Sequence, residues 1–271
     1  MTAIHPVRVN HLNAVVEDFE ASVAHLRGLF DADFLMDLPQ REWHAGLIDI
    51  GRVIFELFVP PAFLLNARYG PHYLGVEYQA DMAVVRAAVA AHGIRIVRDI
   101  GVALHIHPAD CFGVAFEFYG GSFHDNEWPL LGRAMHPAAY WREVHPLGLT
   151  GLRHYTLAVR DPGAASRFLQ AFLGATPLYE IARPGIAAHA IGLHAGDSGI
   201  EVLGPTGGGA LADHLAAHGE GIRSVVFGVS DLDRARRYFT GRGCVTIAGS
   251  APGSFALAPA ATLGLLVEFA A

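Results

Sequence analysis

The chain has 271 residues, of which 52% are hydrophobic, and a formal net charge of −7. Its length and apolar content are enough for a substantial core and predict two similar domains. All 19 basic residues are arginines, and they are scattered along the sequence, which argues against a nucleic-acid-binding surface. Because there is no lysine, Schiff-base catalysis and a Walker-type phosphate loop are excluded.

Targeting signals and disulfides are not expected either. No apolar run reaches the ~20 uninterrupted residues that a membrane helix needs, and no basic segment precedes an apolar one at the start of the sequence. The two cysteines, Cys111 and Cys244, are too few for a disulfide framework. These features predict a cytoplasmic protein that has neither a membrane nor a nucleic acid as its partner.

The first segment of the chain predicts one strand, one helix and then three strands. The first strand lies in the β-rich run 7–16, and Asp18 can cap a helix that runs from about Phe19 to Leu29. The other strands are expected at residues 34–37, 43–49 and 53–59. The order of elements is therefore βαβββ.

The same order recurs three more times. Each repeat has an aspartate that can cap a helix and a glycine near the place where that helix should end. These pairs are Asp81 and Gly93, Asp161 and Gly174, and Asp231 and Gly241. Repetition of one supersecondary unit is information about the fold in its own right, so we predict four βαβββ modules.

A segment of different character separates the second and third modules. Residues 120–148 are rich in proline, tryptophan and histidine and show no strand period. We interpret the segment as an ordered linker, because large aromatic side chains usually pack against something; a lid over a pocket is the alternative. The predicted domains are residues 1–121 and 149–271, each a pair of modules, joined by a linker at 122–148.

A polar residue in the first strand of each module is followed by a glutamate in the last strand of the same module. The members of each pair are 45, 45, 47 and 44 residues apart. Because imidazole and carboxylate groups are ligands of transition metals, this repetition predicts a metal site. The serine in the fourth copy indicates that the two halves are not equivalent. The pairs are His11 and Glu56, His72 and Glu117, His154 and Glu201, and Ser224 and Glu268.

The modular pattern resembles the vicinal oxygen chelate superfamily, which includes glyoxalase I, methylmalonyl-CoA epimerase, bleomycin-resistance proteins and extradiol dioxygenases. Three sequence segments are most similar to the epimerase and glyoxalase branch: 105–110 (HIHPAD), 204–206 (GPT) and 218–222 (HGEGI). The resemblance covers nearly the whole chain and implies an α+β, glyoxalase-like fold, in which four modules pair into two open, cupped mixed-sheet barrels. It also implies that the N-terminal half holds a divalent metal through His11, Glu56, His72 and Glu117.

The implied cofactor is one divalent transition metal: Fe, Mn, Co, Ni or Zn. In three modules a further histidine lies 12 residues before the glutamate, at His44, His105 and His189. If the last two strands of a module form a hairpin centred between these residues, His44 faces Glu56 and His105 faces Glu117. Such histidines could orient the carboxylates or move protons, whereas a β-bulge would turn them away. The candidate catalytic residues are therefore His44, Glu56, His105 and Glu117.

In the C-terminal half only His154, Glu201 and Glu268 remain as candidate ligands. Ser224 is a poor ligand, because its hydroxyl group is neutral near neutral pH. This half could bind metal weakly, bind an organic ligand without metal, or serve as scaffold. We favour the scaffold.

Two enzyme functions follow from the resemblance. The first is an isomerase, epimerase or glyoxalase-type lyase, in which the metal chelates adjacent oxygens of a small substrate while Glu117 or Glu56 moves a proton. The second is an Fe(II) extradiol-type dioxygenase acting on an aromatic diol, which needs two histidines and one carboxylate.

A function from a different class is also open, namely a non-catalytic protein that binds a small molecule. The sequence does not name the substrate. Arg8, Arg41 and Arg68 could each meet a carboxylate or phosphate, although isolated arginines usually lie on the surface. The chain could be a monomer or a homodimer.

Overall fold

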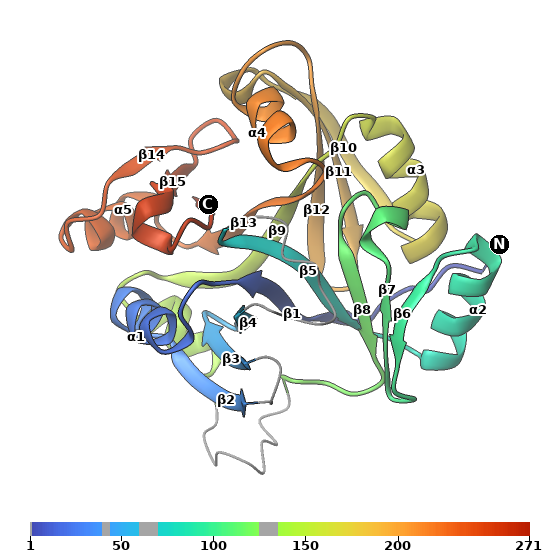
Figure 1. The fold of residues 1–271 in the computed structure, drawn as a ribbon. Coiled ribbons are helices and arrows are strands. Elements are labelled where there is room, and N and C mark those ends of the chain that lie inside the picture. The colour runs from blue at the N-terminus through green and yellow to red at the C-terminus, as the bar shows by residue number, and fades with distance from the viewer. Residues whose placement is uncertain (1, 40–43, 60–69, 125–134) are drawn as a thin grey trace. The chain divides into compact units, whose positions relative to one another are not determined.

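The computed structural model describes residues 2–39, 44–59, 70–124 and 135–271. In these residues the order of elements is βαβββ, repeated four times (Figure 1). The predicted modules are confirmed. One further helix, α4 (Ala210–His218), lies in the connection between the third and fourth modules.

Each module contributes one strand, one helix and three more strands. The first contains β1 (Arg8–Val15), α1 (Phe19–Phe30), β2 (Asp33–Pro39), β3 (His44–Ile50) and β4 (Val53–Val59). The second contains β5 (His72–Gln79), α2 (Met82–His92), β6 (Ile96–Asp99), β7 (Ala103–Ile106) and β8 (Ala115–Tyr119). The third contains β9 (Leu149–Ala158), α3 (Pro162–Leu173), β10 (Thr176–Arg183), β11 (Ala188–Ala195) and β12 (Ser198–Pro205). The fourth contains β13 (Gly221–Val229), α5 (Leu232–Thr240), β14 (Thr246–Ala248), β15 (Phe255–Leu257) and β16 (Val267–Ala270).

The predicted helix ends are confirmed. Asp18, for example, accepts a hydrogen bond from the backbone N–H of Ala21 at 2.8 Å, which satisfies one of the amide groups left over at the start of α1. Gly93 and Gly174 follow α2 and α3 with φ values of 64° and 69°, a left-handed conformation that glycine adopts without a steric penalty.

The strands form two eight-stranded sheets, one from each half of the chain. Their orders are β2-β3-β4-β1-β5-β8-β7-β6 and β10-β11-β12-β9-β13-β16-β15-β14. Within each module the first strand pairs in parallel with the last strand, and the other pairs are antiparallel. These mixed sheets confirm the predicted α+β, glyoxalase-like fold.

The chain also separates into two compact units that combine modules from the two halves. Unit 1 contains residues 1–11, 74–122 and 154–223, and unit 2 contains residues 12–73, 123–153 and 224–271. Because these units divide the chain differently from the sheets, the domain boundaries drawn from the sequence remain a prediction.

Each unit has its own aromatic core. In unit 1 the fully buried residues include Tyr78, whose hydroxyl lies 2.9 Å from that of Tyr155. In unit 2 the rings of Phe239, Phe255 and Phe269 pack with centroids 4.9 to 6.4 Å apart, a range typical of aromatic pairs in protein cores.

The described part of the linker is packed as the sequence indicated. Trp141 is fully buried on a short π-helix, Tyr140–Val144. The next residue, His145, is also buried, and its Nδ1 accepts the backbone N–H of Leu147 while its Nε2 lies 3.1 Å from Asp31. Residues 125–134 lie outside the described part of the chain, so the lid hypothesis remains untested.

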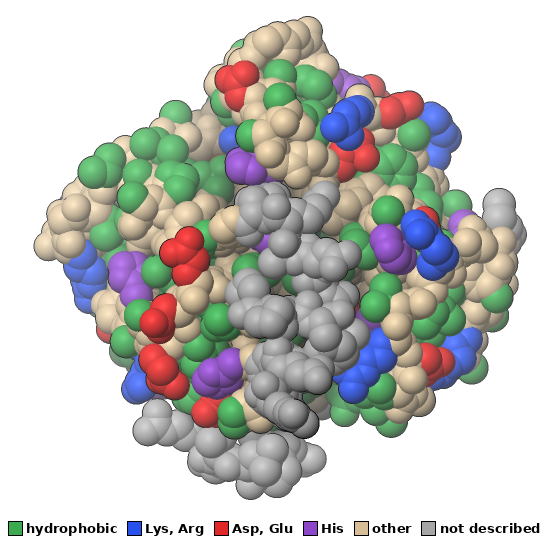
Figure 2. Space-filling model, viewed as in Figure 1, with side chains coloured by type: hydrophobic (Ala, Val, Ile, Leu, Met, Phe, Trp, Pro, Cys, Tyr) green, Lys and Arg blue, Asp and Glu red, His purple; other side chains and the backbone are tan. Residues whose placement is uncertain are grey.

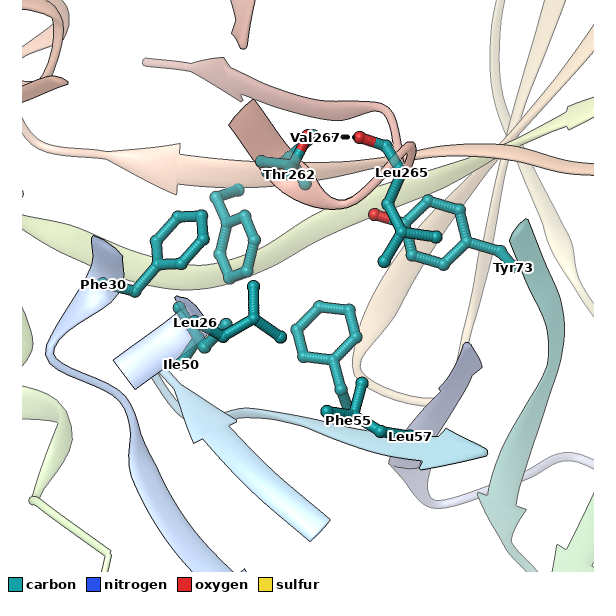
Figure 3. A pocket seen from close by; sticks show the side chains of 10 residues that line it. Leu26, Phe30, Ile50, Phe55, Leu57, Tyr73, Thr262, Leu265 and Val267 are labelled. Atoms are coloured by element: carbon teal, nitrogen blue, oxygen red, sulfur yellow. Dashed lines mark hydrogen bonds between the residues drawn. The ribbon is translucent and has the colours of Figure 1, made fainter. Parts of the chain in front are cut away.

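Unit 2 contains a cavity with about 310 Å³ of empty space, part of it open to solvent (Figure 3). Its few polar atoms are already engaged, since Tyr73 donates to the carbonyl of Leu266 and Thr262 donates to the carbonyl of Leu265. No metal ligand or catalytic group lines it, so the chemistry must be sought elsewhere. The lining residues are Leu26, Phe30, Ile50, Phe55, Leu57, Tyr73, Phe227, Thr262, Leu265 and Val267.

On the face drawn in Figure 2, arginine and acidic side chains are interspersed among the coloured residues. No helix within the described ranges has the length and apolar character required to cross a membrane.

Candidate metal centre

Strand pairing in the second module aligns four polar residues. Glu117 on β8 pairs in register with Glu77 on β5 and with His105 on β7. His105 in turn pairs with Arg98 on β6. Residues directly opposite each other on neighbouring strands project from the same face of a sheet. Arg98, His105, Glu117 and Glu77 therefore form one row, which we call the module 2 row.

Each of the other three modules has an equivalent row of cross-strand partners, and each of these rows contains the repeated glutamate. The companions of that glutamate differ, and only the module 2 row has a charged or ionisable residue at all four positions. The other rows are Met36, Leu47, Glu56 and Asn13; Tyr179, Gly192, Glu201 and Thr156; and Ile247, Ala256, Glu268 and Val226.

His11 on β1 joins the module 2 row to form a cluster of three ligand groups. One ligand atom from each of His11, Glu77 and Glu117 lies within 4.8 Å of the others. The imidazole Nε2 is 3.3 Å from Glu77 Oε1, and the exposed fractions of the three residues are only 2%, 5% and 2%. Two carboxylates this close and this deeply buried are stable only with a compensating positive charge or a shared proton. The donor set of one imidazole and two carboxylates fits a divalent transition metal.

Neighbouring groups hold both carboxylates in place. The side-chain amide of Asn10 donates to Glu77 Oε1 at 3.2 Å and to the carbonyl of Gly121 at 3.1 Å. His105 Nδ1 contacts Glu117 Oε1. Groups that fix the orientation of metal ligands in this way commonly strengthen metal binding.

The cluster contains two of the four predicted ligands and one residue that the sequence reasoning missed. His11 and Glu117 lie close together, and their role as ligands remains a prediction. The register of β5 places Glu77 beside Glu117, where His72 had been expected. His72 and Glu56 are buried in unit 2, and their role as ligands remains a prediction. The available signal for Glu77 was a lone charge in the apolar run of β5.

The predicted pairing of His44 with Glu56 is wrong. His44 lies opposite Val59, and Glu56 lies opposite Leu47. The cause is the tight turn between β3 and β4, where Gly51 has a positive φ of 66° and the hairpin closes nearer to Glu56 than predicted. His44 instead contacts Asp37 at 2.5 Å, so the structure gives no support for a catalytic role.

The predicted pairing of His105 with Glu117 is confirmed. Here a 3-10 helix, Pro108–Asp110, lengthens the connection between β7 and β8. The third module follows the tight-turn pattern of the first, since His189 lies opposite Gly204 and not opposite Glu201. Only one of the three repeated histidines therefore faces its glutamate.

In the third module the protein itself neutralises the row carboxylate. Arg183 donates from Nε and Nη2 to Glu201 Oε1, and the hydroxyl of Tyr179 donates to the same oxygen at 2.9 Å. Burial and the negative charge of Glu201 raise the pKa of Tyr179 to about 12, so its hydroxyl remains a donor at neutral pH. A buried carboxylate that already has a guanidinium partner has no need of a metal.

The fourth module satisfies its carboxylate with serines. Ser224 donates to Glu268 Oε1 at 2.6 Å, and Ser250 donates to the same carboxylate from both its backbone N–H and its hydroxyl. In the described part of the C-terminal half, no three ligand groups lie as close together as those around His11. These contacts support the scaffold interpretation of that half.

The four modules and two mixed sheets define a protein of the glyoxalase-like class. Residues 151–253 match the model of the Glyoxalase/Bleomycin resistance protein/Dioxygenase superfamily. The match covers less than half of the chain and agrees with the resemblance to vicinal oxygen chelate proteins that the sequence indicated. Curated protein sequences give no significant match.

Among solved structures, a triple mutant of 4-hydroxymandelate synthase from Streptomyces coelicolor is similar over 97% of this chain and 92% of its own, with a TM-score of 0.74 and 15% identity. At that identity the similarity shows the fold alone. Methylmalonyl-CoA epimerase from Mycobacterium tuberculosis matches 45% of this chain and 87% of its own, with 25% identity and a TM-score of 0.43. A match with so low a TM-score does not bear on function.

Proposed function

We propose that the protein is a metal-dependent enzyme that chelates adjacent oxygens of a small organic substrate and catalyses proton transfer, as an isomerase, epimerase or glyoxalase-type lyase does. The observation that carries this proposal is the buried cluster of His11, Glu77 and Glu117. The match of residues 151–253 to a superfamily that contains glyoxalases supports it.

The three ligand side chains would contribute differently to metal binding. His11 supplies a neutral nitrogen, and Glu77 and Glu117 supply the negative charges that balance a divalent ion. When bound, such an ion serves as a Lewis acid for negative charge that develops on the substrate oxygens. Asn10 keeps Glu77 in position through the hydrogen bond described above.

His105 is placed to move the proton. Its Nδ1 contacts Glu117, which fixes the ring orientation and leaves Nε2 as the atom that can exchange a proton. The His105 side chain is 13% exposed, whereas that of Glu117 is 3% exposed. A substrate entering the row from solvent therefore meets His105 before it meets Glu117. We assign His105 as the proton-transfer residue and Glu117 as the group that orients it.

A dioxygenase is the alternative enzyme. The usual iron site of that chemistry has two histidines and one carboxylate, whereas the cluster here has one histidine and two carboxylates. The donor set therefore favours proton transfer over oxygen activation.

The test is to load the purified protein with Zn²⁺, measure bound metal, and incubate it with 2-oxobutanoate in D₂O. NMR then follows deuterium exchange at the carbon next to the keto group. We expect about one metal per chain and exchange faster than that of free Zn²⁺. His11→Ala should lose both, whereas His154→Ala, the matched position in the third module, should keep both.

Two results would overturn the proposal. Oxygen consumption with catechol by the Fe²⁺-loaded protein, without any proton exchange, would establish the dioxygenase. A wild-type protein that takes up no metal after reconstitution would contradict both enzyme functions and leave the non-catalytic small-molecule binder.

A further inference from the structure

The described part of the linker packs against the face of module 1 that carries Glu56. Leu47 is the cross-strand partner of Glu56, and Ile54 lies two positions before Glu56 on β4, so their side chains share one face of the sheet. Met135 and Phe123 of the linker join Leu47 and Ile54 in one hydrophobic cluster. All of these residues belong to unit 2. The linker therefore covers this face of module 1.

An acidic residue, Asp49, is buried on the same face. It pairs with Ile54 on β4 and with Asp33 on β2, and it is fully buried. Burial raises the pKa of Asp49, and the indole N–H of Trp141, on the π-helix of the linker, partly offsets this effect and so lies beside the carboxyl. Neither Trp141 Nε1 nor either carboxylate oxygen has a partner with hydrogen-bond geometry among the described residues. A carboxyl in such surroundings is costly to ionise.

The two charged groups nearest to Asp49 also hold the linker. Arg52 donates from Nη2 to the carbonyl of His124 at 3.0 Å. Asp33 Oδ2 accepts the backbone N–H of His136 at 3.2 Å and lies 2.6 Å from its Nδ1. An ionised Asp49 would attract the guanidinium of Arg52 and repel the carboxylate of Asp33. Ionisation of this one carboxyl would therefore disturb both contacts with the linker.

The sign of the pH dependence follows from the burial of Asp49. Burial raises the pKa of this carboxyl from 3.8 to about 8, which outweighs the opposing charge of Arg52. The contribution of the protonated carboxyl is therefore complete below pH 3.8 and is lost as the pH rises through about 8. The ring of His145 lies 4.6 Å from that of Trp141, and burial lowers the pKa of His145, so this imidazole is neutral where Asp49 titrates.

We propose that the linker is a proton-dependent cover of module 1, which is docked while Asp49 is protonated and is released when that carboxyl ionises. Release would expose Leu47 and Ile54 and open this face of unit 2 to solvent. Arg234 donates to the carbonyl of His145 at 2.5 Å, so the end of the linker stays attached and the change is local. The inference involves no metal and does not depend on the proposed function.

The experiment makes Trp141 the single fluorescent reporter. The other two tryptophans, Trp43 and Trp128, are replaced by phenylalanine in every protein tested. Quenching of Trp141 by acrylamide is then measured between about pH 5 and 9.5, with far-UV circular dichroism to follow the overall fold. We expect the quenching constant to rise about 3-fold or more with a midpoint near pH 8, as the buried indole becomes accessible through a local opening. The circular dichroism should not change.

The decisive variant is Asp49→Asn, which should keep Trp141 shielded over the whole range. Asp37→Asn, which removes an exposed carboxylate of β2 that contacts His44, and His136→Gln, which removes the imidazole beside Asp33, should both keep the transition.

Hydrogen exchange of residues 140–148 in the wild-type chain, corrected for the intrinsic effect of pH, checks the same opening without a substitution. Protection should fall with the same midpoint. Trp141 that is equally shielded at pH 6 and pH 9, a transition retained in Asp49→Asn, or a simultaneous loss of circular dichroism would each overturn the inference.

Discussion

Unit 1 contains two equivalent rows of cross-strand partners, one in the second module and one in the third. Each row contains a buried glutamate, but the groups around that glutamate differ. In the module 2 row, Glu117 lies among Glu77, His105 and His11, so two carboxylates share one buried cluster. In the third module the corresponding Glu201 is paired with Arg183. In our proposal an external cation completes the first arrangement, whereas the second contains its own.

A single small residue makes the second arrangement possible. Gly192 occupies the position that His105 has in the module 2 row, and a Cβ atom there would lie 2.4 Å from the ring of Tyr179. Because glycine has no side chain, Tyr179 can lie across the strand and donate to Glu201. The comparison shows that one repeated glutamate can be a ligand candidate in one module and a structural acceptor in another.

The largest stability effect should come from breaking the internal ion pair. Arg183→Leu leaves Glu201 buried without its cation and should lower the free energy of unfolding by about 3–5 kcal/mol, as measured by urea denaturation. The double variant Arg183→Leu, Glu201→Leu should recover most of that loss, because apolar residues can replace a buried ion pair. A single variant as stable as wild type would show that Glu201 has another partner.

A third kind of buried carboxylate sharpens the comparison. Asp49 in unit 2 is fully buried, and burial, which outweighs the charge of Arg52, raises its pKa from 3.8 to about 8. The proton is therefore held more tightly in the folded state, so the contribution of Asp49 to stability is greatest below pH 3.8 and falls as the pH rises toward 8.

Asp49→Asn should remove this pH dependence. Between about pH 4 and 8, the gain in stability of the variant over wild type should grow by about 1.4 kcal/mol per pH unit at most. Urea denaturation of both proteins at pH 5, 6, 7 and 8 measures the difference. Parallel pH profiles would mean that Asp49 is ionised in the folded protein across this range.

The smallest effect on stability should come from removing the hydroxyl of Tyr179, whose ring lies against Gly192. Tyr179→Phe removes one hydrogen bond to Glu201 and leaves both donor groups of Arg183, so we expect a loss of about 1 kcal/mol. Metal binding should not change, because this row holds no metal in our account. Reduced metal content in Tyr179→Phe would show that the two rows are coupled.

Much of the fold could be predicted from sequence, because its signals are local. Asp18 and Gly93, for example, mark helix ends through contacts within a few residues. The site was harder to predict, because it depends on strand register. The turn at Gly51 and Arg52 shifts the β3–β4 hairpin and separates His44 from Glu56, and spacing in the sequence does not reveal which turn will form.

The regular spacing of the repeats also concealed a ligand candidate. His72 lies 45 residues before Glu117, the same interval as between His11 and Glu56, yet the partner of Glu117 across β5 is Glu77. Connections of different length within the modules shift the strands relative to one another. A constant interval therefore does not ensure an equivalent position. Arg41 and Arg68, considered as anion-binding residues, lie outside the described part of the chain.

The most direct test of the central claim is the metal content of wild type and two variants after reconstitution with Zn²⁺, measured by elemental analysis. Wild type should hold about one ion per chain, Glu77→Gln should lose it, and Glu201→Gln should keep it. The same ion retained in Glu77→Gln and lost in Glu201→Gln would place the metal in the third module and contradict the account.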